Sequence, residues 1–347
     1  MNESWLAYLS GMGAVLDAGR VAHFGDPAGE LHAAKSATIV CDLSHMGLIQ
    51  FTGDEAQSFL QGQLSCDVGA LDPNASSYGS YSTPKGRMLA TFLLWRAAAG
   101  FFMQLPIELR ESVQKRLSMF ILRAKVKAAD VSAQYVRIGV AGADAARLSM
   151  SAAGSVPDRL HGVTHGVDAS VIRLPGERFE IVTSPERAIV LWDSLRAQAT
   201  PAGAPCWDWL DIACGIATIT PRTQDQFVPQ MANLDLIGGV SFDKGCYPGQ
   251  EIVARTQYRG QIKRRMVRAN VVSSAAPLPG DELFRADFPG QSSGMIVNSA
   301  PSPDGGYDVL AVVQIAGAAA NAMHLKAPDG PALTLLELPY ALPGQQA

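Results

Sequence analysis

The sequence predicts an α+β protein that ends in an all-β segment, and three observations support this fold class. A series of strand, helix, strands and helix occurs twice, and its helix openings at Gly53 and Gly142 lie about 89 residues apart. From Val267 onward the pattern changes to short alternating segments separated by turn residues. A composition of 48% hydrophobic and 17% charged residues is typical of a globular chain with more than one core.

The first copy of the series is expected at about residues 36–131, after a helix at 5–16 and a polar loop. Gly53-Asp54-Glu55 opens a helix to about Cys66, with acidic residues in the first turn, where the helix dipole favours them. Apolar spacing predicts an amphipathic helix at 107–122. The strands of this copy are expected at 38–41, 47–52, 77–82, 88–95, 101–105 and 124–131.

The second copy is expected at about residues 132–265, and the all-β segment at 266–347. Pro185 begins a helix to residue 197, and a further helix is expected at 206–216. Strands are predicted at 136–141, 170–174, 179–183, 295–298 and 307–315. Turn residues between the late strands indicate a small antiparallel barrel or sandwich.

Charge and cysteine content exclude several classes of protein. A net charge of -4 gives no global basic character for nucleic-acid binding. Five cysteines without a C-x-x-C pair argue against a disulfide framework, a zinc site or a cluster held by this chain, and favour a reducing compartment. The start lacks the features of a signal peptide, and the most apolar region, 88–109, is interrupted by polar residues. A cytoplasmic protein without a membrane span is expected.

The segment from Lys244 to Glu251, K-G-C-Y-P-G-Q-E, carries most of the chemical information. Cys246 precedes a helix predicted to begin at Gln250, and Lys244 lies two residues before it. Both features favour a thiolate over a thiol. Gly245 and Gly249 would allow the backbone to approach a ligand closely. The alternative is that Cys246 is a small buried residue without a chemical role.

A basic strip accompanies this segment. Seven cations oppose only Asp243 and Glu251, a local net charge of +5 (7 − 2), and the strip is a candidate seat for a carboxylate or phosphate. Solvated basic residues on a strand are the alternative interpretation. The cations are Lys244, Arg255, Arg259, Lys263, Arg264, Arg265 and Arg268.

The same octapeptide resembles the K-G-C-Y-x-G-Q-E signature of the folate-binding YgfZ family, which is related to the aminomethyltransferase, or T-protein, of the glycine cleavage system. The similarity extends over nearly the whole chain. Further matching segments are 59–64, Lys85-Gly86-Arg87-Met88, 226–230, Val253-Ala254-Arg255 and Leu338-Pro339-Tyr340.

The resemblance implies two intertwined α+β modules (36–131 and 132–265) around a central folate cavity, in a T-protein-like region 1–265, with a C-terminal β-barrel at 266–347. It implies tetrahydrofolate or a related folate as cofactor. It also implies iron–sulfur proteins or their assembly machinery as partners, with an indirect influence on tRNA modification through a cluster-containing methylthiotransferase. Direct contact with nucleic acid is not expected.

Site residues follow from the matched positions. Cys246 would be a redox-active or metal-donating thiol that Lys244 and Arg255 tune. Tyr247 and Gln250 would shape the turn, and Glu251 completes the motif. The folate-binding candidates are Trp207, Met46, Asn233, Gly245 and Gly249.

Two departures from the T-protein pattern bear on activity. The hairpin that carries an acid in those relatives reads Leu89-Ala90 here, so no carboxylate is available for aminomethyl transfer. Ala213 stands where a pterin-binding acid is expected, unless Asp208 or Asp211 replaces it. The favoured function is a folate-dependent accessory factor. A one-carbon transferase and a non-catalytic folate-binding or docking module are the alternatives.

Overall fold

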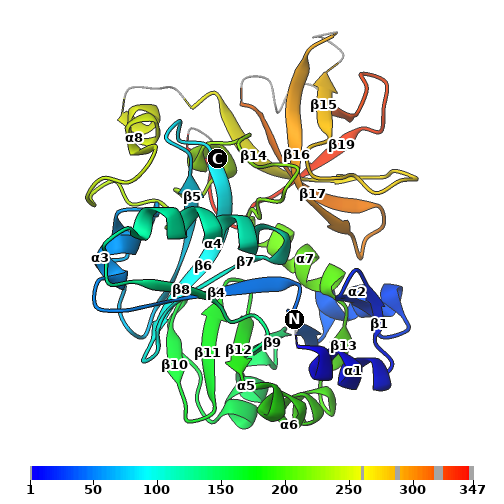
Figure 1. The fold of residues 1–347 in the computed structure, drawn as a ribbon. Helices are drawn as coiled ribbons and strands as arrows, with labels where there is room; N and C mark the ends of the chain where they lie inside the picture. The colour runs from blue at the N-terminus through cyan, green and yellow to red at the C-terminus, as the bar shows by residue number, and fades with distance from the viewer. Residues whose placement is uncertain (1, 259–261, 286–289, 316–322, 344–347) are drawn as a thin grey trace. The chain divides into compact units, whose positions relative to one another are not determined.

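The computed structural model describes residues 2–258, 262–285, 290–315 and 323–343. The chain forms two compact units, each assembled from separate stretches (Figure 1). Unit 1 comprises Met1–Gln63, Asp67–Tyr78 and Phe92–Trp207, and unit 2 comprises Leu64–Cys66, Gly79–Thr91 and Asp208–Ala347. The mixed α+β class is as predicted, whereas the predicted module boundaries remain a proposal.

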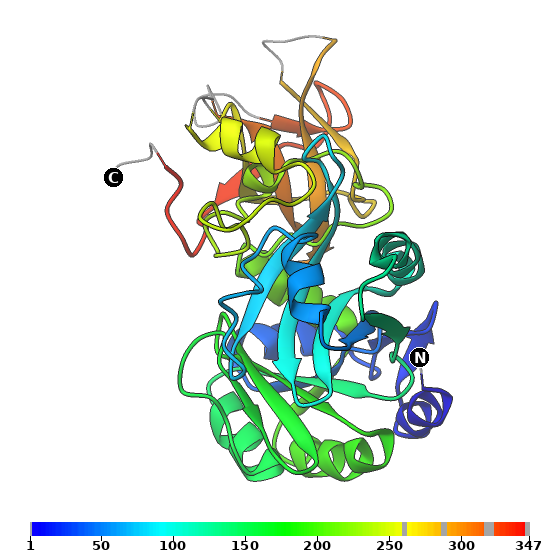
Figure 2. The same ribbon diagram turned by 60° about the vertical axis from the view of Figure 1, so that its left-hand side comes forward.

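A six-stranded sheet with helices on one face forms much of unit 1. Figure 2 shows helices α5 (Ala145–Ala153) and α6 (Pro185–Arg196) side by side against it. The apolar face of α6 buries Leu191, Trp192 and Leu195 in the same core as Trp5 of α1 (Glu3–Gly11). The strand order is β10 (Val163–His165), β11 (Ala169–Leu174), β12 (Arg178–Thr183), β9 (Val136–Ala141), β3 (Ile39–Asp42) and β13 (Thr200–Ala202).

A second sheet has five strands, and helix α4 (Ile107–Ile121) packs on its strands β4, β7 and β8 (Figure 1). Leu109, Val113 and Leu117 form the buried stripe of α4, at the spacing expected of an amphipathic helix. The strand order is β5 (Ser76–Ser82), β6 (Met88–Ala97), β7 (Gly100–Pro106), β4 (Met46–Thr52) and β8 (Lys127–Asp130).

The two sheets repeat one topology, as the sequence pattern predicted. The chain order β4-α3-β5-β6-β7-α4-β8 recurs as β9-α5-β10-β11-β12-α6-β13. The spatial orders also correspond, except that β3 lies between β9 and β13 in the six-stranded sheet. Because β3 directly precedes β4 in the chain, consecutive strands belong to different sheets, which is how the two repeats are intertwined.

Two local predictions near the N-terminus and after Gly53 were wrong. Helix α3 (Ala56–Gln61) ends well before Cys66, because the Gln61 side chain accepts the backbone N–H groups of Val68 and Gly69 and turns the chain. The first helix ends at Gly11 and is followed by strands β1 (Val15–Asp17) and β2 (Arg20–His23).

A helix was also missed in the predicted polar loop. Helix α2 (Pro27–Ser36) is capped by Asp26, whose side chain accepts the N–H of Gly29, and Pro27 occupies its first turn. This Asp-Pro start is a normal helix signal. The helix escaped prediction because it has no apolar stripe and buries the acidic Glu30, whose carboxylate accepts the backbone N–H groups of Phe24 and Gly203.

The C-terminal sheet is a curled half-barrel, so the predicted closed barrel is corrected. Its order is β18 (Met323–Leu325), β15 (Glu282–Arg285), β16 (Ser292–Pro301), β17 (Tyr307–Gln314), β14 (Arg264–Val271) and β19 (Leu333–Leu336). The end strands β18 and β19 have three and four residues, and within the described residues only the isolated bridge His324–Ala332 links them. Strands this short cannot form the ladder that closes a barrel.

Candidate functional site

Cys246 lies in a loop of unit 2, the motif loop (residues 244–249), which leads into helix α8 (Gln250–Tyr258). Its side chain is exposed, whereas Cys41, Cys66 and Cys206 are buried and Cys214 is half-buried. Solvent can therefore reach the thiol of Cys246 more readily than that of any other cysteine. The alternative that Cys246 is a buried residue is therefore wrong, while a chemical role for its thiol remains a prediction.

The side chain of Lys244 supports the motif loop from inside the protein and does not extend into solvent. Only 9% of its surface is exposed, and its Nζ donates to the carbonyl oxygens of Leu64 (2.7 Å) and Cys66 (2.9 Å). The same ammonium group lies 5.1 Å from the ring centroid of Tyr247, within range of a cation–π contact. These contacts give Lys244 a structural task in addition to any influence on the neighbouring thiol.

Tyr247 is the second buried support of the loop. It is 7% exposed, and its hydroxyl has no hydrogen-bond partner within the part of the chain that the structure describes. Burial, and to a smaller extent the nearby Cys66, raises the pKa of Tyr247 to about 12. The phenol is therefore neutral at physiological pH and packs as an apolar ring with an unsatisfied hydroxyl.

The two motif glycines differ in their surroundings. Gly249 has a φ of +83°, and a Cβ there would lie 2.5 Å from the Thr83 carbonyl oxygen and from the Cα of Gly86. A Cβ at Gly245 would meet no atom within 4 Å. Gly249 is thus explained by close packing against the 83–86 turn. This contact joins two of the matched segments, the Lys85-Gly86-Arg87-Met88 hairpin and the octapeptide.

The remaining motif residues complete the loop and its helix. Gln250 closes the turn, because its Oε1 accepts the N–H of Tyr247 (3.3 Å) and its Nε2 donates to the carbonyl of Lys244 (3.4 Å). Glu251 in the first turn of α8 and Arg255 in its last are both exposed. Lys244, Tyr247, Gly249 and Gln250 therefore form one structural unit that presents Cys246.

The basic strip does not form a single anion-binding site. Lys244 is bound to carbonyls, Arg265 makes a bidentate pair with Asp235 (2.6 and 2.9 Å), and Arg268 pairs with Asp308 (2.7 Å). Three of the seven cations thus have internal partners, which the local charge count did not reveal. Arg255, Lys263 and Arg264 are exposed, and Arg259 lies outside the described residues.

Trp207 and Met46, two of the folate candidates, lie in unit 1 and both contact arginines of the six-stranded sheet. The Trp207 ring is 5% exposed and lies so close to Gly139 that a Cβ there would be 2.5 Å from it. The guanidinium carbon of Arg178 is 4.9 Å from the ring centroid. Met46 is half-buried, and its carbonyl accepts a hydrogen bond from Arg137. A ligand would thus meet a Trp207 ring that is already packed.

Asn233, the third folate candidate, is fully buried in unit 2. It has a φ of +56°, and its Nδ2 donates to the carbonyl of Met266 (2.8 Å) in β14. Nδ2 also lies 3.4 Å from the hydroxyl of Tyr340, which donates to the carbonyl of Gly215 (2.7 Å). This network joins Asn233 to β14 and to the matched segment Leu338-Pro339-Tyr340, and it gives Asn233 a structural role, while its contact with folate remains a prediction.

The sequence analysis did not identify the segment Leu64–Cys66, in which the carbonyl oxygens of Leu64 and Cys66 accept hydrogen bonds from Lys244. The contact spans about 180 residues, and carbonyl acceptors carry no side-chain signature, so no motif could have indicated it. Leu89 and Ala90, which the resemblance aligns with the acidic hairpin of the transferases, lie at the start of β6. Ala90 is fully buried, and the carbonyl of Leu89 accepts a hydrogen bond from Gln224 (2.7 Å).

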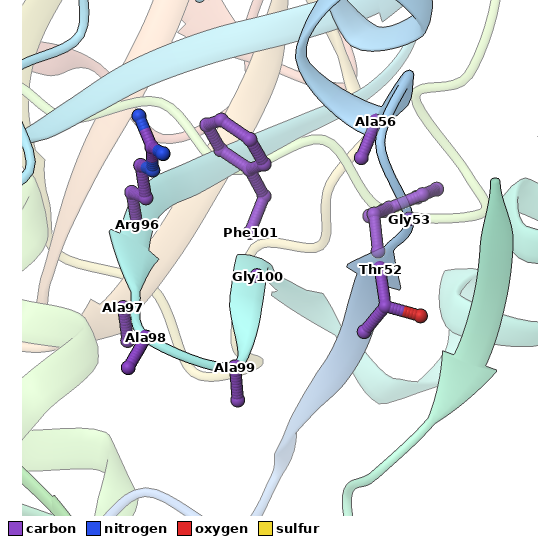
Figure 3. A pocket seen from close by; sticks show the side chains of 10 residues that line it. Thr52, Gly53, Ala56, Arg96, Ala97, Ala98, Ala99, Gly100 and Phe101 are labelled. Atoms are coloured by element: carbon purple, nitrogen blue, oxygen red, sulfur yellow. The ribbon is translucent and has the colours of Figure 1, made fainter. Parts of the chain in front are cut away.

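A hollow of about 320 Å³ lies elsewhere, in unit 1, and contains none of the predicted site residues (Figure 3). It is lined by Ala97 at the end of β6 and by Ala98 and Ala99 of the β6–β7 turn. The guanidinium carbon of Arg96 lies over the ring of Phe101, 5.6 Å from its centroid. Across the described ranges, no group of three or more metal-ligating side chains occurs. Within the same ranges, no helix has the length and apolar character needed to cross a membrane.

Comparison with known proteins places the chain in a family. The model of the GCVT N-terminal domain matches residues 12–244. A protein of Sodalis glossinidius called tRNA-modifying protein YgfZ is 32% identical over 304 residues, which cover 86% of this chain and 92% of the relative. A protein of the same name from Pectobacterium carotovorum is 30% identical over 315 residues, covering 90% and 94%. The chain belongs to the YgfZ family.

A solved structure confirms the T-protein-like fold of this YgfZ-family chain. The glycine cleavage system aminomethyltransferase T of Bartonella henselae superposes with a TM-score of 0.80 over 97% of both chains, at 19% identity. At this identity the likeness concerns the fold alone. The GCVT match ends at Lys244, so Cys246 lies just beyond the region shared with that domain.

Proposed function

We propose that the protein is a tetrahydrofolate-binding accessory factor for iron–sulfur cluster assembly or repair, with Cys246 as its functional thiol and an indirect influence on tRNA modification. The observation that carries the proposal is the exposed thiol on a loop fixed by the buried Lys244 and Tyr247. One exposed cysteine cannot hold a cluster by itself, which fits action on a cluster or metal that belongs to a partner.

Two further observations support the folate part. The T-protein-like fold is that of a folate-dependent enzyme class, as the resemblance implies. Gly139 and Arg178 fix the position of the Trp207 ring. An aromatic ring that is already in place suits contact with a flat pterin. The Leu89-Ala90 hairpin supplies no carboxylate, so the proposal gives the folate a role other than aminomethyl transfer.

The thiol is tested by complementation of a bacterial strain that lacks its own family member. Cys246→Ser should fail to restore methylthiolated tRNA and the activity of an iron–sulfur enzyme, whereas the matched control Cys214→Ser should restore both. Iodoacetamide should modify Cys246 first in the native protein, because the other thiols are less exposed. Full complementation by Cys246→Ser would refute the thiol role.

The folate is tested by anaerobic calorimetric titration with tetrahydrofolate. Saturable binding should weaken in Trp207→Phe and persist in Trp192→Phe. Trp192 is a buried tryptophan of the core that also contains Trp5 and does not include Trp207. An absence of heat up to about millimolar ligand, a level typical of very weak binding, would remove folate from the proposal and leave the thiol role standing. Aminomethyl transfer to tetrahydrofolate would instead establish the transferase alternative.

A further inference from the structure

The C-terminal end of helix α4 exposes three large apolar side chains in close succession. Met119 is 59% exposed, Phe120 48% and Leu122 86%. Helix α4 packs on the five-stranded sheet through Leu109, Val113 and Leu117. Phe120 continues the spacing of this stripe but is exposed beyond its buried part, whereas Met119 lies off the stripe and Leu122 follows the helix. Three large apolar side chains exposed within four residues of the chain indicate an interaction site more often than single scattered ones do.

Leu122 also adopts an unfavourable backbone conformation. Its φ is +47° and its ψ is −104°, and the N–H of Ala124 donates to the carbonyl of Ile121 (2.8 Å). Leu122 is thus the first central residue of a turn close to type II′, for which the ideal angles are about +60° and −120° and glycine is the usual residue. A leucine at this position brings backbone strain and an exposed side chain, two costs that binding can offset.

Positive charge surrounds these side chains. Residues 112–129 contain five cations and no acid, in a chain whose net charge is -4. Within the described residues no ion pair joins Lys115, Arg116 or Arg123 to a carboxylate. Arg110, one turn earlier, pairs with Asp130, and Glu55 accepts the backbone N–H of Lys125 (2.7 Å), so these flanking charges are partly balanced.

Helical spacing brings the two kinds of residue together. Met119 follows Lys115 by four residues and Phe120 follows Arg116 by four, so each apolar side chain has a cation one turn away on the same side of α4. Arg123 adjoins Leu122. The α4-end patch consists of Lys115, Arg116, Met119, Phe120, Leu122 and Arg123.

We propose that the α4-end patch docks an acidic polypeptide segment in which apolar side chains stand between carboxylates. Opposite charge on the partner would neutralise the unpaired cations, and its apolar side chains would cover Met119, Phe120 and Leu122. The proposal goes beyond folate and Cys246 and rests on neither.

Other occupants fit the patch less well. A second copy would place one basic patch against another across a two-fold axis, where like charges repel. RNA-binding surfaces use several aromatic rings for base stacking, and the patch has only Phe120. A membrane-surface helix presents a long apolar face, whereas the long stripe of α4 is buried in unit 1.

The test uses three fluorescently labelled peptides and the full-length protein. The first peptide alternates Asp and Glu with Leu and Phe, the second replaces the acids by Asn and Gln, and the third replaces Leu and Phe by Ser. Fluorescence anisotropy should show that the wild type binds the first peptide most tightly. Added salt should weaken this binding, because part of it is electrostatic.

Two variants examine the two components of the patch. Met119→Ser with Phe120→Ser and Leu122→Gly removes the apolar part, and Lys115→Glu with Arg116→Glu and Arg123→Glu reverses the charge. Each should weaken binding of the first peptide at least about tenfold, the scale of losing a central contact. The control, Leu160→Ser with Val167→Ser, changes apolar residues that are 53% and 101% exposed elsewhere in unit 1 and should bind like the wild type.

Three results would overturn the proposal. The wild type shows no binding to the first peptide up to about 1 mM, the weak limit of specific recognition. Alternatively, both patch variants bind it as the wild type does, with circular dichroism confirming that they are folded. Finally, a tRNA transcript or vesicles containing phosphatidylserine bind through the same residues and more tightly than the peptide, which would assign the patch to RNA or membrane.

Discussion

The motif loop and the α4-end patch both expose a feature that stability alone does not require, but they support it in opposite ways. In the motif loop, Cys246 is supported by hydrogen-bonded residues, chiefly the buried Lys244 and the half-buried Gln250. In the α4-end patch, Leu122 is exposed at a strained turn. A recognisable motif can therefore be mostly scaffold around one chemical group, whereas an interaction surface can lack any motif and be recognised only by exposure, charge and backbone strain in the folded protein.

The largest effect is expected for Lys244→Met, which tests whether the motif is scaffold. The variant leaves two buried carbonyls, of Leu64 and Cys66, without their charged donor. Urea unfolding should show a loss of about 3 kcal/mol in the free energy of unfolding. Lys85→Met, at an exposed position of the 83–86 turn, is the control and should stay within about 0.5 kcal/mol of the wild type. Unchanged stability in Lys244→Met would mean that the contact with these carbonyls is incidental and that the charge serves the thiol.

Gly249→Ala should have the next largest effect, and Gly245→Ala is its control within the same motif. Alanine at 249 would adopt a φ of +83° and place its Cβ 2.5 Å from the Thr83 carbonyl oxygen. We expect a loss of about 2 kcal/mol from strain and displacement of the turn. Gly245→Ala meets open space and should be nearly neutral. If instead Gly245→Ala abolished complementation without changing stability, close approach of a ligand to Gly245 would be indicated.

The motif loop and its surroundings illustrate which features of the fold and the site can be predicted from the sequence and which cannot. The repeated topology and the strands and helices with regular apolar spacing were predictable, because period and turn residues are local properties. The roles of Lys244, Arg265 and Asn233 were not, since their partners at Leu64, Asp235 and Met266 are distant or lack a side-chain signal. Exposure of Cys246 was an open question in the sequence, because burial depends on which segments pack around a loop.

Tyr247→Phe separates packing from chemistry in the motif loop. Removing a buried hydroxyl without a partner should leave stability at pH 7 unchanged or raise it by up to about 1 kcal/mol. The pKa of Tyr247 is raised to about 12 in the folded protein, from 10.0, so the wild type should lose stability as the pH rises from about 10 to about 12. The variant should lose less over this window, with Tyr340, whose pKa burial also raises to about 12, accounting for part of the remainder.

Tyr258→Phe is the control for that experiment, because Tyr258 is 69% exposed and its removal should not alter the alkaline profile. Urea midpoints measured from pH 7 to pH 12 for the three proteins give the comparison. A stability loss of more than about 1 kcal/mol at pH 7 in Tyr247→Phe would show that the hydroxyl makes a stabilising interaction. Lost complementation at unchanged stability would make the hydroxyl part of the chemistry.

The smallest effect is expected at Leu122, where substitution tests whether backbone strain in the α4-end patch lowers the stability of the protein. Leu122→Gly relieves a φ of +47° without removing buried surface, because the side chain is 86% exposed. Stability should rise by about 0.5–1 kcal/mol, reduced from the strain energy by the greater freedom of glycine in the unfolded chain. Leu122→Ala keeps the strained angle and removes most of the exposed side chain, so it should stay near the wild type in thermal unfolding.

A stabilised Leu122→Gly that binds the acidic peptide less tightly would show that this leucine serves recognition at the expense of stability. Equal stability of the three proteins would instead mean that the turn tolerates leucine at no cost, and the case for the patch would then depend on its charge and exposure alone.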